Sequence, residues 1–169
     1  MPYVREILTD GHPTLRKTAK KVDPKEIRDP LFQQLIDDMF ETMYAAPGVG
    51  LAAPQVNVSK RLFVMDVHDD EHEPTVVINP KIESLEEEVE LREGCLSVPA
   101  MIGEIVRYKR AVVTGLDREG QKIRIEGEGL LAQCLQHEID HLDGKLYIDR
   151  ATNLRSAESE EEEKETADA

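Results

Sequence analysis

The chain has 169 residues, 40% of them hydrophobic, which is enough for one domain with a buried core. Its formal net charge is −14, of which −6 falls after residue 155, and this argues against nucleic-acid binding through a basic surface. Because the chain has no apolar stretch long enough to span a membrane, no N-terminal signal segment and only two cysteines, we expect a cytoplasmic protein without a membrane segment or a disulfide.

The first predicted element is a helix that begins at Asp29-Pro30. A proline at the first helical position is favourable, because its missing N–H would have no partner there. The apolar residues that follow repeat with helical period: Leu31, Leu35, Ile36, Met39, Phe40 and Met43. Pro47-Gly48 then ends the helix.

Residues 48–55 are small and apolar except for one polar side chain, Gln55. The run is not a dinucleotide-binding fingerprint, because it follows a helix, lacks a third glycine and contains Pro54, which prevents a helix from starting there. Small side chains and a single amide suit the wall of a substrate cleft. In such a cleft Gln55 would donate a hydrogen bond to a developing oxyanion.

Strands are predicted next, from runs rich in valine and isoleucine at 61–67, 75–79, 87–91, 105–114 and 122–126. Residues 117–120, Asp-Arg-Glu-Gly, indicate a hairpin turn. His68 and His72 lie four residues apart in an acidic loop, where we expect them to be solvated. A weak adventitious metal site is the alternative there.

The last predicted helix follows Glu128, ends near Gly144 and carries His-Glu-Ile-Asp-His at 137–141. Histidines four residues apart lie about 40° apart on one helix face, so both imidazoles can bind one metal ion. Glu138 projects to the side of this pair, which suits a general base. Two solvated histidines on a surface helix are the alternative, but the apolar residues of this segment predict a buried helix, in which polar groups need partners. We therefore expect an α+β fold with antiparallel β-sheets packed around this buried metal-binding helix.

A catalytic site of this type usually has three protein ligands and one open position. Cys134 lies on the same helix, but it is seven residues, or about 10.5 Å, from His141, so we expect a buried wall residue. Cys95, in Glu-Gly-Cys-Leu-Ser at 93–97, is the remaining candidate and lies in a turn between two strands. A structural cysteine in a buried loop is the alternative reading of Cys95.

Three motifs in this order and spacing resemble those of peptide deformylases. They are Gly-x-Gly-x-Ala-Ala-x-Gln at 48–55, Glu-Gly-Cys-x-Ser at 93–97 and Gln-His-Glu-x-Asp-His at 136–141. The resemblance extends from roughly residue 4 to residue 150. It implies a metal-dependent hydrolase that removes the N-formyl group from the N-terminal methionine of newly synthesised proteins.

The resemblance also implies roles for individual residues. The expected metal ligands are Cys95, His137 and His141. The expected catalytic groups are Glu138 as general acid and base, and Gln55 with the backbone N–H of Leu96 at the oxyanion. Glu93 and Arg107 are expected to support the ligands from behind. The expected substrate-binding residues are Val49, Gly50, Leu91, Gly94, Leu130, Gln133 and Cys134.

The implied cofactor is one divalent transition metal, with Fe(II) as the expected native ion and Zn(II), Ni(II) or Co(II) as alternatives. The implied partners are the N-formylmethionyl peptides of nascent chains, together with a transient association with the ribosome. Two residues depart from the family pattern. Gln133 stands where an apolar residue is commoner, and Ile102 stands where many relatives carry an arginine, so both concern substrate preference.

We expect one catalytic domain over residues 1–150, followed by an acidic tail over 151–169 that is disordered or, alternatively, binds a partner. Two other functions share the His-Glu-x-x-His helix. A small metallopeptidase would need a third ligand downstream, which the sequence lacks outside the acidic tail. A non-catalytic metal-binding module would need a fourth protein ligand, and none is evident.

Overall fold

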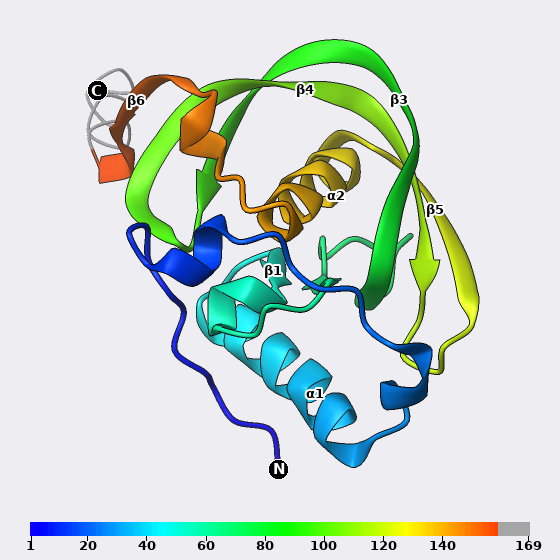
Figure 1. Ribbon diagram of the computed structural model, residues 1–169. Coiled ribbons are helices and arrows are strands. Elements are labelled where there is room, and N and C mark those ends of the chain that lie inside the picture. The colour runs from blue at the N-terminus through cyan, green and yellow to red at the C-terminus, as the bar shows by residue number, and fades with distance from the viewer. Residues whose placement is uncertain (159–169) are drawn as a thin grey trace.

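The computed structural model describes residues 1–158 (Figure 1). This part of the chain contains two α-helices, α1 (Pro30–Ala45) and α2 (Gly129–Leu142). The strands are β1 (Gly50–Ala52), β2 (Leu62–Met65), β3 (Thr75–Cys95), β4 (Val98–Leu116), β5 (Lys122–Glu128) and β6 (Thr152–Ser156). Short 3₁₀ turns lie at Pro13–Arg16, Pro24–Glu26, Ala53–Val56 and Tyr147–Asp149.

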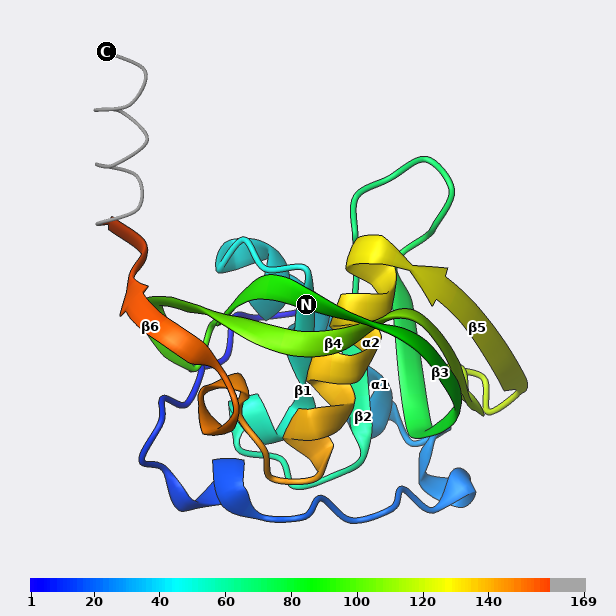
Figure 2. The ribbon, with the colours of Figure 1, turned by 90° about the horizontal axis from the view of Figure 1, so that it is seen from above.

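The strands form one antiparallel sheet in the order β1-β2-β3-β4-β5, and β6 pairs with β4. Figures 1 and 2 show β3, β4 and β5 curving around α2, whose buried face packs against β4, β5 and β1. Helix α1 lies against β1 and β2 on the other side of those strands. This arrangement confirms the expected α+β fold with an antiparallel sheet around the helix that carries His-Glu-x-x-His.

Strands β3 and β4 are longer than the sequence predicted. The two predicted runs at 75–79 and 87–91 belong to one strand, because β3 continues past Pro80 through register shifts at 78–81 and 82–84. Such irregularities bend a strand and accommodate a proline that cannot donate to the ladder. The bend lets the β3–β4 hairpin curve over α2 (Figure 1). Cys95 is the last residue of β3, and its Sγ lies 3.3 Å from Nε2 of His141 on α2.

The helix boundaries follow the expected signals. Asp29 caps α1 by accepting a hydrogen bond from the N–H of Leu31, and Pro30 is the first helical residue. Helix α2 ends before Gly144, which has a φ of +74°. A Cβ at Gly144 would lie 2.5 Å from the carbonyl oxygen of Arg16, so only glycine fits this close approach.

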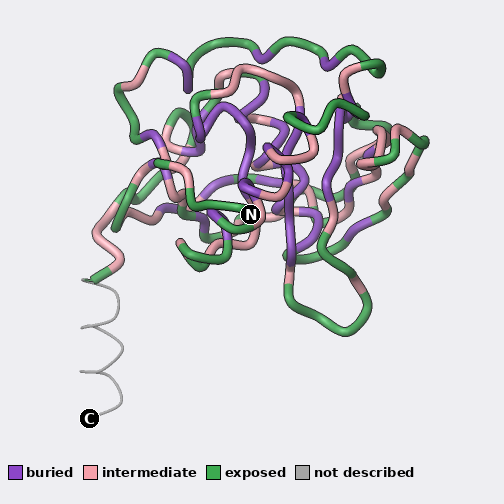
Figure 3. The backbone as a smooth tube through the Cα atoms, turned by 90° about the horizontal axis from the view of Figure 1, so that it is seen from below, coloured by how far each residue is buried: buried purple, intermediate pink, exposed green. Residues whose placement is uncertain are grey.

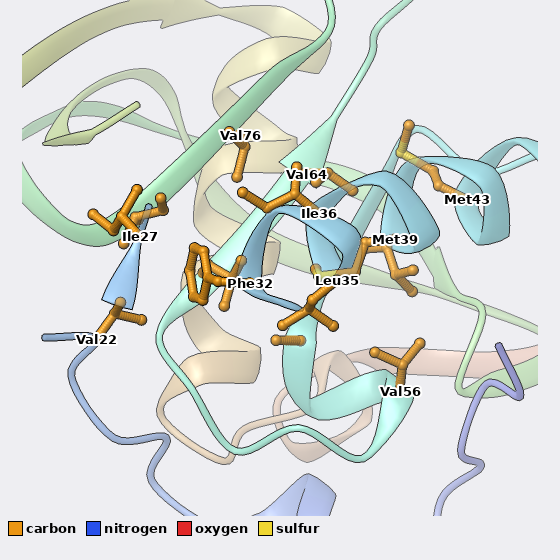
Figure 4. Close-up of a cluster of buried hydrophobic side chains, with 14 residues drawn as sticks. Val22, Ile27, Phe32, Leu35, Ile36, Met39, Met43, Val56, Val64 and Val76 are labelled. Carbon is orange, nitrogen blue, oxygen red and sulfur yellow. The ribbon is translucent and has the colours of Figure 1, made fainter. Parts of the chain in front are cut away.

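Two buried clusters stabilise the fold. One joins the apolar face of α1 to β2 and β3 through Phe32, Leu35, Ile36, Met39, Val64 and Val76 (Figure 4). The other surrounds α2 and includes Phe63, Val113, Leu131, Leu135 and Ile139. Figure 3 shows the buried stretches inside the molecule, with exposed residues on the loops around them. The buried face of α2 therefore excludes water, and polar residues on that face need specific partners.

The chain continues in regular structure beyond residue 150. Strand β6 pairs with β4 at residues 101–104, and Arg155 donates hydrogen bonds to both carboxylate oxygens of Glu104. The boundary expected after residue 150 stays a prediction, and the acidic run from residue 159 lies outside the described residues. Within residues 1–158, no helix has the length and apolarity needed to cross a membrane.

Candidate metal centre and active site

Helix α2 presents His137 and His141 on one face. The apolar residues Leu131, Leu135 and Leu142 are buried in the core, which leaves the two histidines directed toward the end of the β3–β4 hairpin. Their ring centroids are 4.8 Å apart, as expected for residues separated by one helical turn. The predicted pairing of the two imidazoles is therefore present in the structure.

Cys95 completes a group of three converging ligand atoms. The Nε2 atom of His141 lies 3.2 Å from the Nε2 of His137 and 3.3 Å from the Sγ of Cys95. Zinc-type bond lengths in a tetrahedral arrangement place neighbouring ligand atoms about 3.3 to 3.6 Å apart. All three atoms lie within 4.8 Å of one another, and no other group of three or more potential ligands gathers among residues 1–158. The acidic loop with His68 and His72 therefore forms no such group.

The two histidines differ in their partners and in their protonation. Nδ1 of His137 lies 2.8 Å from the carboxylate of Glu93, which leaves Nε2 facing the other two donor atoms. Burial lowers the pKa of His141 well below its ordinary value, and the neighbouring His137 lowers it further. His141 is therefore a neutral imidazole, the form that binds metals. A divalent cation bound to Nε2 of both histidines would take the place of a proton between these two nitrogens, which lie 3.2 Å apart.

The pKa of His137 moves in the opposite direction. Burial by itself would lower the pKa, but the hydrogen bonds with Cys95 and Glu93 raise it well above the ordinary value. The same Glu93 carboxylate therefore both orients the ring and increases its basicity toward a cation.

Cys134 does not join the three ligand atoms. Its Sγ lies 3.7 Å from the carbonyl oxygen of Val49, and the residue is buried. Burial raises the pKa of the Cys134 thiol well above its ordinary value, and the charges of Glu138 and Glu93 raise it further. A protonated thiol is a poor metal ligand. Cys134 is buried and lies outside the group of three donor atoms, and its expected role as an apolar wall of the site stays a prediction.

Glu93 is held by a buried ion-pair network behind the histidine. Arg107 donates to both of its oxygens, at 3.0 and 2.6 Å, and donates to Asp140 at 2.6 Å. Burial would raise the pKa of Glu93, but the hydrogen bonds from His137 and Arg107 outweigh it and bring the pKa down to about 2. Glu93 thus remains a carboxylate that pairs with Nδ1 of His137 and with Arg107, and the expected role of Glu93 and Arg107 in supporting a ligand stays a prediction.

Glu138 is a buried carboxyl group beside the three ligand atoms. Its Oε1 has no hydrogen-bond partner among the described residues, although buried polar atoms are normally paired. Burial raises its pKa to about 7, so it can exchange a proton near neutral pH. A Cβ at Gly50 would lie 2.6 Å from Oε2 of Glu138 and 2.8 Å from Sγ of Cys134. A larger side chain at position 50 would therefore displace the carboxyl group of Glu138.

Gln55 faces the centre from the opposite wall. Its Oε1 accepts a hydrogen bond from the N–H of Ala52 at 3.0 Å, which orients the amide so that Nε2 points toward Cys95 and Ser97. Nε2 lies 3.0 Å from Oγ of Ser97 and 3.8 Å from Sγ of Cys95. Gln55, the residue expected to donate a hydrogen bond to the oxyanion, is therefore buried, and its Nε2 lies next to Sγ of Cys95.

A cavity of about 410 Å³ opens beside these groups. The expected residues that line it are Val49, Gly50, Gln55, Glu93, Gly94, Cys95, Leu96, Leu130, Gln133, Cys134, His137 and Glu138. Pro47, Gly48 and Arg92 complete the lining. Three residues with expected roles do not line the cavity: Leu91, His141 and Arg107. Leu91 pairs with Ile105 on β4, and the side chains of the other two residues are buried. Ile102 pairs with Gly94 on the neighbouring strand.

Two polar residues had no role assigned from sequence. The N–H of Ser97 lies 3.4 Å from Sγ of Cys95, and its hydroxyl group accepts from Gln55. Asp140 accepts hydrogen bonds from Arg107 and from Arg150 at 2.8 Å. Ser97 lies within the Glu-Gly-Cys-x-Ser motif, and Asp140 lies within the Gln-His-Glu-x-Asp-His motif. Their place in these motifs is the sequence feature from which a role in the site could have been predicted.

Comparison with known proteins identifies the family. The family model of polypeptide deformylase matches residues 4–157. The chain belongs to this family. It is 53% identical to the peptide deformylase of Azotobacter vinelandii over 150 residues, which are 88% of each chain. It is 50% identical to that of Symbiobacterium thermophilum over 165 residues, 98% of this chain and 75% of the relative.

Solved structures of peptide deformylases share the fold. The crystal structure of the peptide deformylase from Legionella pneumophila is 51% identical, covers 89% of this chain and 87% of its own, and superposes with a TM-score of 0.83. A class I type b peptide deformylase from Acinetobacter baumannii, solved with Met-Ala-Ser bound, is 33% identical and has a TM-score of 0.84, with 89% of this chain and 99% of the other covered.

Membership of the peptide deformylase family gives the reaction. The protein is a metal-dependent hydrolase that removes the N-formyl group from the N-terminal methionine of newly synthesised proteins. The metallopeptidase and the non-catalytic metal-binding module are thereby set aside. The group of Cys95, His137 and His141 is where the described part of the chain can hold the metal.

Proposed function

We propose that Cys95, His137 and His141 hold one divalent transition ion and that Glu138 moves the proton in deformylation. One observation carries this proposal. Three ligand atoms converge at 3.2 and 3.3 Å, next to a buried carboxyl oxygen without a partner among the described residues. The three donors and the carboxyl group are the components that metal-assisted amide hydrolysis requires.

When bound, the ion supplies a Lewis acid that polarises the formyl carbonyl group and lowers the pKa of water. Glu138 takes a proton from the attacking water and then gives it to the departing amine as the carbon–nitrogen bond breaks, which yields formate and a free N-terminus. A pKa of about 7 suits both transfers. Nε2 of Gln55 and the N–H of Leu96 donate hydrogen bonds to the oxygen as it becomes an anion.

The cavity fits a methionyl substrate. Val49, Leu130 and Cys134 provide an apolar wall, and Gly50 and Gly94 let the extended peptide backbone approach. The Met-Ala-Ser bound to the related enzyme from Acinetobacter baumannii is the chemical product of such a reaction. We infer that the substrates are N-formylmethionyl peptides of nascent chains in the cytoplasm, reached through a transient association with the ribosome.

The native metal is proposed to be Fe(II). One thiolate and two neutral imidazoles suit Fe(II), Zn(II), Ni(II) and Co(II) better than Mg²⁺ or Ca²⁺. A thiolate ligand and a site open to the cavity would leave an Fe(II) ion accessible to dissolved oxygen, and neither cysteine is in a disulfide.

The assay that tests the function measures formate release from formyl-Met-Ala-Ser by protein purified anaerobically and loaded with Fe(II), Ni(II), Co(II) or Zn(II). The matched control is acetyl-Met-Ala-Ser, whose amide has one additional methyl group. We expect formate release with at least one metal and no hydrolysis of the acetyl peptide. Absence of formate with every metal would reject the proposal.

Oxygen sensitivity tests the identity of the metal. With Fe(II), air is expected to oxidise the ion or the Cys95 thiolate, so activity decays, whereas the Ni(II) and Co(II) forms persist. The measurement is the half-life of activity in air against an anaerobic control. Equal half-lives for all metal forms would argue against an iron centre.

Substitution of Gln55 by alanine tests the oxyanion role. The variant should keep its metal, because Gln55 is not a ligand, and should lose about 10²- to 10³-fold in kcat. KM should change little, since a donor aimed at the oxyanion acts mainly in the transition state. Steady-state kinetics with metal analysis make the comparison, and a change confined to KM would make Gln55 a substrate-positioning contact.

A further inference from the structure

Gln133 lines the cavity, and its amide is already engaged by the protein. Its Nε2 donates to the carbonyl oxygen of Arg92 at 2.8 Å and lies 3.3 Å from Oε1 of Glu93. Both partners belong to β3, whereas Gln133 belongs to α2. Both partners are oxygen acceptors, so the atom of the Gln133 amide that faces them is the nitrogen donor. The amide oxygen in the same position would face two other acceptors.

The contact with Glu93 completes the surroundings of that carboxylate. Oε1 of Glu93 faces Nε of Arg107 and Nε2 of Gln133, and Oε2 faces the second guanidinium nitrogen of Arg107 and Nδ1 of His137. A carboxylate has about four acceptor positions, so each of them has a donor here. Gln133 is also one helical turn before His137, on the same face of α2. The residue therefore touches the group that orients a metal ligand.

We propose that Gln133 is a positioning residue: it ties α2 to β3 and holds Glu93 in the orientation that directs His137 toward the metal. Its two amide protons are directed at Arg92 and Glu93, so they are not free to recognise the substrate side chain. This inference rests on the proposed assignment of His137 as a ligand. An apolar residue at position 133 would have the volume to line the cavity but no donor for Glu93.

The test compares Gln133→Leu with the parent protein in Zn(II) affinity, measured by competition with a chelator. Loss of a group that hydrogen-bonds around a ligand typically lowers metal affinity about 10- to 100-fold, and we expect about tenfold here. Gln133→Arg, which again offers N–H donors to the carbonyl group and the carboxylate, should recover affinity to within threefold of the parent. The preference for formyl-Met-Ala-Ser over formyl-Leu-Ala-Ser should stay within twofold in both variants.

Leu130→Ala is the matched contrast, since Leu130 lines the same cavity from the same helix and its side chain has no hydrogen-bond donor to offer Glu93. It should change the preference between the two peptides and leave Zn(II) affinity unchanged. The exchange rate of the Nδ1 proton of His137, followed by NMR in the Zn(II) form, gives a readout independent of activity and should rise in Gln133→Leu. Unchanged affinity and exchange in Gln133→Leu, or a tenfold change of peptide preference, would overturn the proposal. The Zn(II) stoichiometry of the parent separately tests the metal site itself.

Discussion

Replacement of Glu138 by glutamine is expected to lower kcat by about 10²- to 10⁴-fold while the metal stays bound. The amide has nearly the same shape as the carboxyl group, but it cannot take a proton from water or return one to the amine. Glu138 is not one of the three converging ligand atoms, so metal content should remain at the parent level. Metal analysis and steady-state kinetics on formyl-Met-Ala-Ser measure both quantities.

An exposed carboxylate provides the control for this experiment. Glu90 lies on β3 and is solvent-exposed, so Glu90→Gln removes the same charge without touching the cavity. Its kcat should match the parent within about twofold, as expected for a surface substitution. Near-normal turnover in Glu138→Gln would refute the general-base role.

Replacement of Cys95 by alanine is expected to abolish activity through loss of the metal. The thiolate is the one anionic ligand of the proposed set, and its loss leaves two neutral imidazoles with a neighbouring methyl group. Less than one tenth of an equivalent of metal should remain after purification. His137→Ala and His141→Ala should behave in the same way.

Cys134→Ala is the matched control, because it removes the other thiol that lines the same cavity. Its protonated thiol faces the carbonyl group of Val49, so the variant should keep a full equivalent of metal. Stoichiometric metal in Cys95→Ala, or its loss in Cys134→Ala, would contradict the ligand assignment. The two single variants together separate loss of a ligand from general damage to the cavity.

The strands illustrate why sequence periodicity predicted part of the sheet. The apolar runs in β2, β4 and β5 were recognisable because the residue types that favour a strand are a local property of the sequence. The three-residue β1 was missed, since its run of small residues looks the same in a loop. Strand β6 was missed because Asn153 and Arg155 alternate with few apolar residues, and its place depends on pairing with β4.

Gln133 shows the corresponding limit for a side chain in the cavity. The residue type could be read as a polar group at the rim of the substrate pocket. Its donors are directed at Arg92 and Glu93, some forty residues earlier in the chain, and no local pattern contains that contact. Ser97 and Asp140 are similar, because their partners Gln55 and Arg107 come from distant segments.

The sequence by itself determined the chemistry of this protein: a helix whose His137 and His141 are one turn apart, a flanking Glu138, and three motifs that resemble one enzyme family. Helical spacing is local, so four residues suffice to predict it. Only the tertiary structure decided that Cys95 reaches Nε2 of His141, that Gln55 faces Cys95, and that a buried network centred on Glu93 pairs with His137. These contacts depend on how far the β3–β4 hairpin bends over α2, and that curvature arises from register shifts and packing across the whole sheet.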